Sequence, residues 1–308
     1  MEILPIIEKK ENYDSAVSLR FFRHGDRDKI LTEADQKRLD ELVKDGWSGE
    51  KDYLIKLNEI GRKQAHEGGD ENPNISQSVA FGGPRERSAE TAMRVMVGHD
   101  SSLGDEGDSF EDFLTRLNND RKLGSKVGFN EKLNYIIDQN EETGKELVKN
   151  FGINNGLKWL VNESDRVAKD NGDKNTSTYS MLAGNIASLV DKYYKASDRW
   201  NELASDKSKS YEKELKRFLG THGTITESFL AKVIDKTEGR ERRDEFLDIV
   251  GGNGFDFVEG IKVRIENKGG KKAISIEYEK ELPDDKKFEF KKEINNEILE
   301  EIIGESLK

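Results

Sequence analysis

Residues 19–25 read Leu19-Arg20-Phe21-Phe22-Arg23-His24-Gly25, so an apolar, strand-like run meets a polar turn at His24. A second short apolar run leads to His222, and a third, at residues 78–83, leads to Arg87. The chain holds only four histidines, and two of them therefore stand where a strand ends. Active-site side chains favour such strand ends. Arginine and histidine at three strand ends predict a pocket for a phosphate.

Four segments, in this order, resemble the motifs of the histidine phosphatase superfamily, which has the phosphoglycerate-mutase-like fold. They are Phe-Arg-His-Gly at 22–25, Leu-Asn-Glu-Ile-Gly-Arg-Lys-Gln-Ala at 57–65, Arg-Ser-Ala-Glu-Thr-Ala at 87–92 and Thr-His-Gly at 221–223. The second is similar to the family's L-T-x-x-G-x-x-Q-A helix, and the third to its R-A-x-x-T-A. The resemblance covers residues 16–92 and 216–234 directly.

This resemblance implies an α/β three-layer sandwich with a central, mostly parallel sheet and antiparallel edge strands near the C-terminus. We expect residues 1–308 to form a single histidine-phosphatase-like domain. Within it, residues 118–216 show helical spacing of apolar residues and no convincing strand, which predicts a helical insertion or cap.

Local signals predict three further elements. Thr32 can cap a surface helix that runs to Lys44, with Asp35 at its third position. Alternating apolar residues on both sides of Asn267-Lys268-Gly269-Gly270 predict a hairpin. Apolar residues at helical spacing over 294–303 predict a short terminal helix.

Composition excludes several classes of function. The net charge of −11 disfavours nucleic acid as a partner, because binding its backbone depends on Lys and Arg that neutralise phosphates. The absence of cysteine excludes disulfides, thiolate metal sites and cysteine nucleophiles. No stretch approaches the ~20 apolar residues of a membrane helix, and the N-terminal apolar run is too short for a signal peptide. We therefore expect no membrane association and a cytoplasmic protein.

Phosphoryl transfer needs a cationic, preorganised pocket. Arg23 and Arg87 offer planar forks that can each bind two phosphate oxygens. His24 suits the nucleophile, because a neutral imidazole has a free nitrogen near pH 7. The resemblance implies that His24 becomes a covalent phosphohistidine, that Arg23, Arg87 and His222 hold the phosphate, and that no metal or cofactor is required.

The sequence combines features of two branches of the family. Residues 23–28, with Arg27, are similar to the R-H-G-x-R-x-P of the acid-phosphatase branch, although Lys29 replaces the proline. Arg27 is then a third phosphate-binding arginine. However, Gly223 follows the second histidine, as in the mutase-like branch, where the acid-phosphatase branch has its aspartic acid proton donor. The chain is closer to the mutase-like branch.

The general acid has no exact motif match in this sequence. The mutase-like branch has a glutamate in an L-x-E setting after the second arginine, but Tyr135 stands at the nearest match here. Glu131, Glu106 and Asp108 could each reach a leaving oxygen from a loop, and we select Glu131. Loss of the acid is the alternative.

The function expected from these residues is hydrolysis of a phosphomonoester, on a phosphorylated small molecule or a phosphoprotein. A non-catalytic phospho-ligand binding protein and, less favoured, a phosphomutase are the alternatives. Oligomeric state is not determined by the sequence. Arg85 is expected on the surface, and His66 and His99 have no motif context, so neither receives a role.

Overall fold

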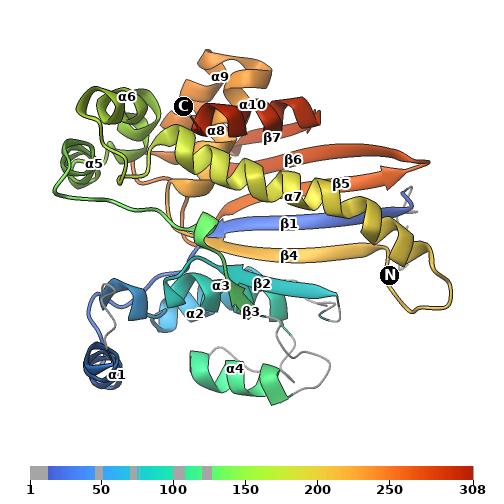
Figure 1. Cartoon of the computed structure of the whole chain (residues 1–308), viewed down its shortest axis with the longest axis horizontal. Coiled ribbons are helices and arrows are strands. Elements are labelled where there is room, and N and C mark those ends of the chain that lie inside the picture. Colours follow the sequence, from blue (N-terminus) through green and yellow to red (C-terminus); the bar gives the residue numbers. More distant parts are fainter. Residues whose placement is uncertain are drawn as a thin grey trace.

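The computed structural model describes residues 13–45, 51–69, 75, 77–99, 108–119 and 127–307, which form one seven-stranded sheet with helices on both faces (Figure 1). The strands are β1 (Ser15–Arg23), β2 (Ser78–Gly82), β3 (Val127–Phe129), β4 (Glu214–Thr221), β5 (Gly260–Lys268), β6 (Lys271–Leu282) and β7 (Lys286–Ile294). The helices are α1 (Glu33–Lys44), α2 (Glu59–Glu67), α3 (Glu86–Val97), α4 (Phe110–Asn119), α5 (Glu142–Gly152), α6 (Gly156–Asn171), α7 (Tyr179–Ser205), α8 (Ile225–Glu238), α9 (Arg240–Val250) and α10 (Asn296–Ser306), with 3-10 turns η1 (Lys51–Leu54) and η2 (Glu131–Leu133).

The sheet has the strand order β3-β2-β4-β1-β5-β6-β7. Strands β3, β2, β4 and β1 are parallel, and β5, β6 and β7 continue from β1 as an antiparallel meander. This confirms the predicted fold class, with its antiparallel strands near the C-terminus. Leu19, Phe21 and Phe22 of β1 are all at most 2% exposed. Leu19 and Phe21 pack in the apolar cluster of the α7 layer, and Phe22 packs in that of the α3 layer.

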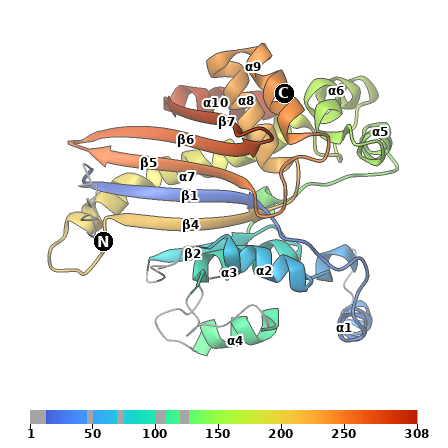
Figure 2. The same ribbon diagram turned by 180° about the vertical axis from the view of Figure 1, so that it is seen from behind.

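The helices form two layers. Helix α7 crosses one face of the sheet over β1 and β5, with α8 and α10 packed beside it (Figure 1). Helix α3 covers β2 and β4 on the opposite face, and α2 packs against α3 (Figure 2). Each layer has its own cluster of buried apolar residues. No helix in the described part of the chain is long and apolar enough to cross a membrane.

The predicted local elements are present. The Thr32 hydroxyl accepts a hydrogen bond from the Asp35 backbone and caps α1. Gly269 and Gly270 adopt positive φ in the turn between β5 and β6, which only glycine adopts without strain. The terminal helix is α10, although Ile294 ends β7 instead of beginning the helix.

Two strands were not expected. Strand β7 carries only three apolar residues among many charged ones. The alternation of apolar and polar side chains is therefore hard to recognise in its sequence. Strand β3 lies inside the stretch 118–216, so the expectation of no strand there was wrong; three residues are too few to show a period. Helix α7 packs on β1 and β5 and thus forms part of the sandwich. The limits of an insertion at 118–216 stay a prediction.

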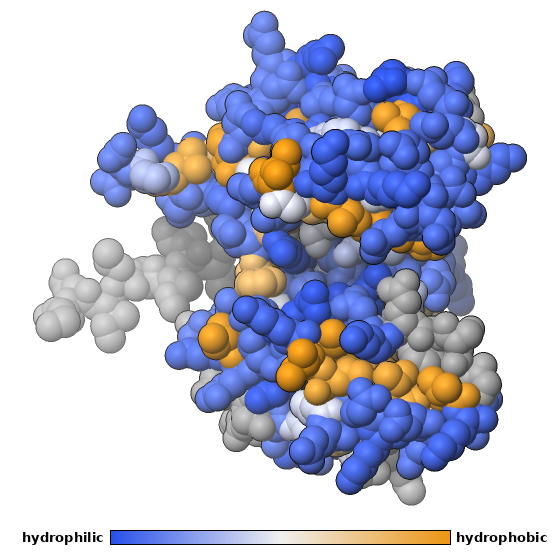
Figure 3. Space-filling model, turned by 90° about the vertical axis from the view of Figure 1, so that its left-hand side faces the viewer, coloured by the Kyte–Doolittle hydropathy of each residue, from blue (hydrophilic) through white to orange (hydrophobic). Residues whose placement is uncertain are grey.

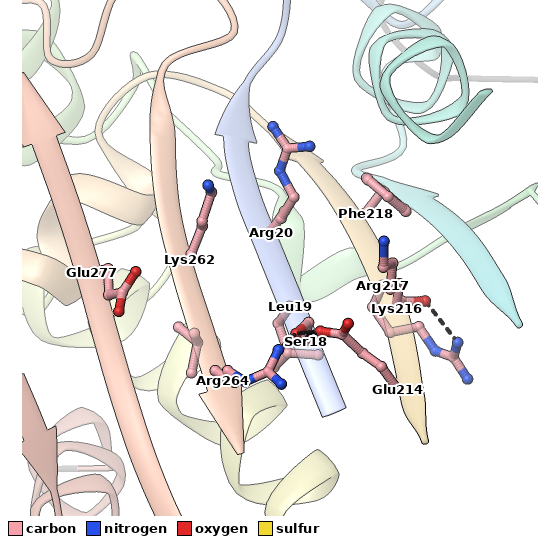
Figure 4. Close-up of a pocket in the computed structure, with 11 residues that line it drawn as sticks. Ser18, Leu19, Arg20, Glu214, Lys216, Arg217, Phe218, Lys262, Arg264 and Glu277 are labelled. Atoms are coloured by element: carbon pink, nitrogen blue, oxygen red, sulfur yellow. Dashed lines mark hydrogen bonds and ion pairs between the residues drawn. The ribbon is translucent and has the colours of Figure 1, made fainter. Parts of the chain in front are cut away.

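A hollow of about 240 Å³ lies on the α3 side of the sheet, over β1, β4 and β5 (Figure 4). Charged side chains of both signs surround it. Arg264 pairs there with Glu214 and Glu266, so opposite charges compensate each other. None of the residues predicted for catalysis lines this hollow.

Candidate active site

The two motif histidines lie side by side. Strands β1 and β4 are parallel neighbours, and their register places Arg23 opposite Thr221. The next residues, His24 and His222, therefore leave the sheet at the same edge, with ring centroids 5.1 Å apart. Helix α3 begins after β2 at this edge and places Arg87 Nε 3.3 Å from His24 Nε2. The structure thus joins three strand ends that are separate in the sequence.

Residues of the second and third motifs contact the turn that follows His24. Gly25 packs against Gly61 so closely that a Cβ on Gly25 would lie 2.6 Å from the Gly61 carbonyl oxygen. The Asn58 amide donates to the Asp26 carboxylate over 3.0 Å, and the Gly25 backbone donates to Thr91 Oγ1 over 3.1 Å. The second and third motifs therefore fix the path of the chain at His24.

Two hydrogen bonds select one tautomer of His24. Its Nδ1 lies 2.6 Å from the Gly25 carbonyl oxygen, which can only accept, so Nδ1 carries the proton. Arg87 Nε–H donates to Nε2, which must then be the unprotonated nitrogen. Burial, and next the charge of Arg87, lower the pKa of His24 well below its ordinary value, although the bond to Gly25 opposes this. His24 is therefore neutral, with its lone pair on Nε2.

His222 is also buried and neutral. It is 2% exposed, and neither ring nitrogen has a hydrogen-bond partner among the described residues. Burial lowers the pKa of His222 well below its ordinary value, and the neighbouring His24 and Arg87 add to the effect. Buried polar atoms in proteins are rarely left without partners. A bound phosphate could accept a hydrogen bond from this ring.

Asp52, which no sequence motif indicated, forms ion pairs with three arginines. Its carboxylate lies 2.9 Å from Arg87 Nη2, 2.7 Å from Arg85 Nε and 3.2 Å from Arg27 Nη1. Partial burial opposes ionisation of Asp52, but the charge of Arg87 and the hydrogen bonds from Arg87 and Arg85 outweigh it and lower the pKa to about 2. Asp52 is therefore an anion that already occupies part of the cationic cluster. A single aspartate outside any motif gives no sequence signal for this role.

The expectation that Arg85 lies on the surface was wrong. Arg85 is 6% exposed, and its guanidinium stacks over the rings of Tyr53 and Tyr135, at 5.2 and 4.8 Å from their centroids. It also donates a hydrogen bond to Asn134. The ion pair with Asp52 compensates its buried charge, which is why the side chain can turn inward.

Arg23 is held by a loop that precedes β5. Its Nη1 donates to the backbone oxygens of Asn253 and Phe255, and its guanidinium lies 4.9 Å from the centroid of the Phe257 ring. The fully buried Glu227 of α8 accepts a hydrogen bond from Phe255 N over 2.7 Å and so fixes that loop. Burial raises the pKa of the Glu227 carboxyl. No motif pointed to Glu227.

His24, His222 and Arg87 line a pocket of about 370 Å³, whereas Asp52, Arg85 and Glu227 lie outside its lining. Figure 3 views the molecule from this end, and the surface is hollowed between an upper and a lower part. Arg27 and Tyr135 line the pocket together with Ile137 and Phe151 of the α5 side. The remaining lining residues are Arg23, Asp26, Asp28, Lys29, Gly223, Asn253 and Phe257.

The structure places the candidate acids elsewhere. Glu131 is exposed in η2 and does not line the pocket. Asp108 pairs with Arg116, and Glu106 lies outside the described residues. The assignment of Glu131 as the acid stays a prediction that the pocket geometry does not favour. The described residues contain no group of three or more His, Asp or Glu side chains that could hold a metal ion.

His66 and His99 lie away from the pocket. Their rings contact each other, with centroids 4.6 Å apart, and neither lines the pocket around His24.

No protein-family profile matches the chain, and no curated protein sequence matches it. Among solved structures it is similar to a mycobacterial hydrolase, with 12% identity and a TM-score of 0.43 over 94% of this chain and 97% of that one. A second mycobacterial hydrolase shares 15% identity, with a TM-score of 0.40 over 82% and 93% of the chains. A mycobacterial glucosyl-3-phosphoglycerate phosphatase in complex with inorganic phosphate shares 13% identity, with a TM-score of 0.37 over 82% and 89%.

Proposed function

We propose that this chain hydrolyses phosphomonoesters through a covalent phosphohistidine on His24, with the phosphate held by Arg23, Arg27, Arg87 and His222. The observation that carries the proposal is the tautomer of His24. Its Nδ1 proton is held by Gly25, and its Nε2 lone pair faces the guanidinium of Arg87. A neutral nucleophile beside fixed cations suits attack on a phosphate dianion.

The reaction has two balanced steps. The Nε2 lone pair of His24 forms a bond to phosphorus as the bond to the leaving oxygen breaks. Water then attacks phosphorus, the N–P bond breaks, and inorganic phosphate leaves with the imidazole restored. The arginines stabilise the charge that spreads over the non-bridging oxygens in both steps.

The walls of the pocket support a phosphorylated small molecule as substrate. A volume of about 370 Å³ lies within the ordinary range for small-ligand sites. Its lining includes the apolar or aromatic side chains of Tyr135, Ile137, Phe151 and Phe257 as well as the arginines. The leaving group of the substrate would contact these side chains.

The test is phosphate release from p-nitrophenyl phosphate by the wild-type chain, His24→Ala and His99→Ala. Turnover that is lost in His24→Ala and kept in His99→Ala supports the proposal, since only the first histidine lies in the pocket. A folded wild type without turnover from acidic to neutral pH would contradict it. Stabilisation by inorganic phosphate without turnover would favour a phosphate-binding protein, and phosphoryl return to an added phosphoglycerate would favour a mutase.

A further inference from the structure

We infer that the phenol of Tyr135 donates the proton to the leaving oxygen, which rests on the phosphatase function proposed above. An alkoxide is a poor leaving group unless a proton reaches its oxygen as the P–O bond breaks, and such a donor contributes about 10²- to 10⁴-fold to the rate. The donor must lie in the pocket and hold a proton at the working pH. These two requirements distinguish the candidates.

The carboxyl groups near the pocket do not meet both requirements. Glu131 is exposed and outside the lining. The pKa of Asp52 is lowered to about 2, so Asp52 has no proton to give. Asp26 lines the pocket, but its carboxylate accepts hydrogen bonds from the Arg27 backbone and from Asn58. Glu131 therefore lies in the wrong place, Asp52 lacks a proton, and the Asp26 carboxylate already accepts two hydrogen bonds.

Asp28 is the remaining carboxyl of the lining. Its side chain has no hydrogen bond or ion pair with the described residues. However, carboxylic acids as a class are ionised near neutral pH and then have no proton to donate. A phenol keeps its proton under the same conditions and still protonates a departing alkoxide. A phenol such as that of Tyr135 therefore meets the requirement for a proton at the working pH. Asp28 is kept as the alternative donor, which the experiment also tests.

Tyr135 is held rigidly beside the reacting groups. Its ring meets that of His222 edge-on, with centroids 5.7 Å apart and planes at 79°. The Arg85 guanidinium lies over the ring at 4.8 Å from its centroid. The neighbouring Ile136 backbone donates to Ser177 Oγ over 2.9 Å. Contacts on the ring face and edge and a bond to the next peptide hold Tyr135 in the lining of the pocket that contains His24 and His222.

The proton transfers balance over one turnover. The leaving oxygen takes the Tyr135 proton as the P–O bond breaks and the bond from His24 Nε2 to phosphorus forms, which leaves a phenolate. The phenolate then takes a proton from the attacking water as the N–P bond breaks. Tyr135 is thereby restored and no external acid is consumed.

The experiment compares kcat/KM for benzyl phosphate, which has a poor leaving group, with kcat/KM for p-nitrophenyl phosphate, which has a good one. The wild type is compared with Tyr135→Phe, which keeps the ring contacts and removes only the hydroxyl. The matched control is Tyr53→Phe, because Tyr53 stacks on the same Arg85 but does not line the pocket. Asp28→Asn tests the remaining carboxyl.

We expect Tyr135→Phe to lose about 100-fold or more on benzyl phosphate and less than about fivefold on p-nitrophenyl phosphate. Tyr53→Phe should match the wild type on both. Equal losses of Tyr135→Phe on both substrates would indicate a structural role and overturn the inference. So would a selective loss in Asp28→Asn with none in Tyr135→Phe, or a wild type that hydrolyses only the nitrophenyl ester. A wild type inactive on both would overturn the phosphatase function itself.

Discussion

Arg87 donates its Nε–H to His24 Nε2 over 3.3 Å, so the proposed nucleophile and a proposed phosphate ligand are in direct contact. The contact keeps the reactive nitrogen unprotonated, and it positions a cation where negative charge grows during transfer. In the proposed mechanism a phosphate displaces this hydrogen bond, after which the same N–H binds a phosphate oxygen. On that proposal Arg87 first keeps His24 unprotonated and then binds the substrate.

Replacing Arg87 should raise the pKa of His24. Burial is the largest cause of its low pKa and the charge of Arg87 is the next. We expect the imidazole of His24 in Arg87→Met to titrate at higher pH than in the wild type. NMR titration of ¹⁵N-labelled histidine can measure this, because the chain has only four histidines. An unchanged His24 titration would show that Arg87 does not control its protonation.

Stability should fall with acidification because of the two buried histidines. The pKa values of His24 and His222 are lowered on folding, so below about pH 6.5 the unfolded chain binds protons that the folded chain does not. Each histidine can then cost up to ~1.4 kcal/mol of unfolding free energy per pH unit, and neither contributes a slope at higher pH. Urea unfolding at pH 7.5, 6.5 and 5.5 measures the slope.

The control for that slope is the double variant His24→Asn with His222→Asn. It keeps the other titrating groups, such as the buried Glu227, and loses only the two imidazoles. The wild type should lose more stability than this variant between pH 6.5 and 5.5. Parallel slopes would mean that the folded protein takes up these protons as readily as the unfolded one.

Removing the charge of Asp52 should strengthen phosphate binding. Its carboxylate competes with phosphate for Arg87 and cancels part of the charge of the arginine cluster. We expect Asp52→Asn to bind inorganic phosphate about tenfold more tightly, which corresponds to a gain in binding free energy of ~1.4 kcal/mol. This gain is a fraction of the ~4 kcal/mol interaction energy between two unit charges near a protein surface. Competitive inhibition of p-nitrophenyl phosphate hydrolysis measures the affinity.

Asp198→Asn is the matched control for Asp52→Asn. Asp198 pairs with Lys272 on the surface, and its loss changes the net charge equally without touching the pocket. Phosphate affinity should not change in this control. Weaker phosphate binding in Asp52→Asn would show instead that Asp52 is needed to hold the arginines in place.

Glu227 should position Arg23 through the loop that both residues contact. Glu227→Ala leaves the Phe255 N–H without its acceptor and releases the carbonyl oxygen that binds Arg23. A displacement of about 1 Å in a site of this kind can cost 10²-fold, so we expect kcat/KM to fall at least tenfold. Glu227→Gln keeps an acceptor and suits a carboxyl whose pKa burial has raised, so it should retain most activity.

A double-mutant cycle separates this role from a general loss of stability. If Glu227 acts through Arg23, then Glu227→Ala should add little to the loss caused by Arg23→Ala. Additive losses in kcat/KM would indicate that the two residues act independently.

The sequence predicted the parts of the fold and site that depend on local pattern. His24, His222 and Arg87 stand next to strands with clear apolar runs, and parallel strands bring their ends to one edge. The cap at Thr32 and the turn at Gly269 are likewise set by the chemistry of a few adjacent residues. Such features can be read without knowing distant contacts.

The features that were missed depend on contacts between distant segments. Arg85 is buried because Asp52, 33 residues earlier, neutralises it and two tyrosines enclose it. Glu227 is linked to Arg23 by the loop at Phe255, which both side chains contact. Strand β3 is formed by pairing with β2 and not by its own pattern. No local periodicity could indicate these relationships.

The most direct test is to trap phosphate on His24. The wild type is mixed with p-nitrophenyl phosphate, quenched in alkali, where phosphohistidine survives, and digested with trypsin. Cleavage after Arg23 and Arg27 releases His24-Gly25-Asp26-Arg27, whereas His222 lies in the peptide of residues 218–232, so mass spectrometry distinguishes the two histidines. If His24 is the nucleophile, phosphate appears on the four-residue peptide and is absent from His24→Ala. Phosphate on the peptide of His222, or turnover without any phosphopeptide, would contradict the mechanism.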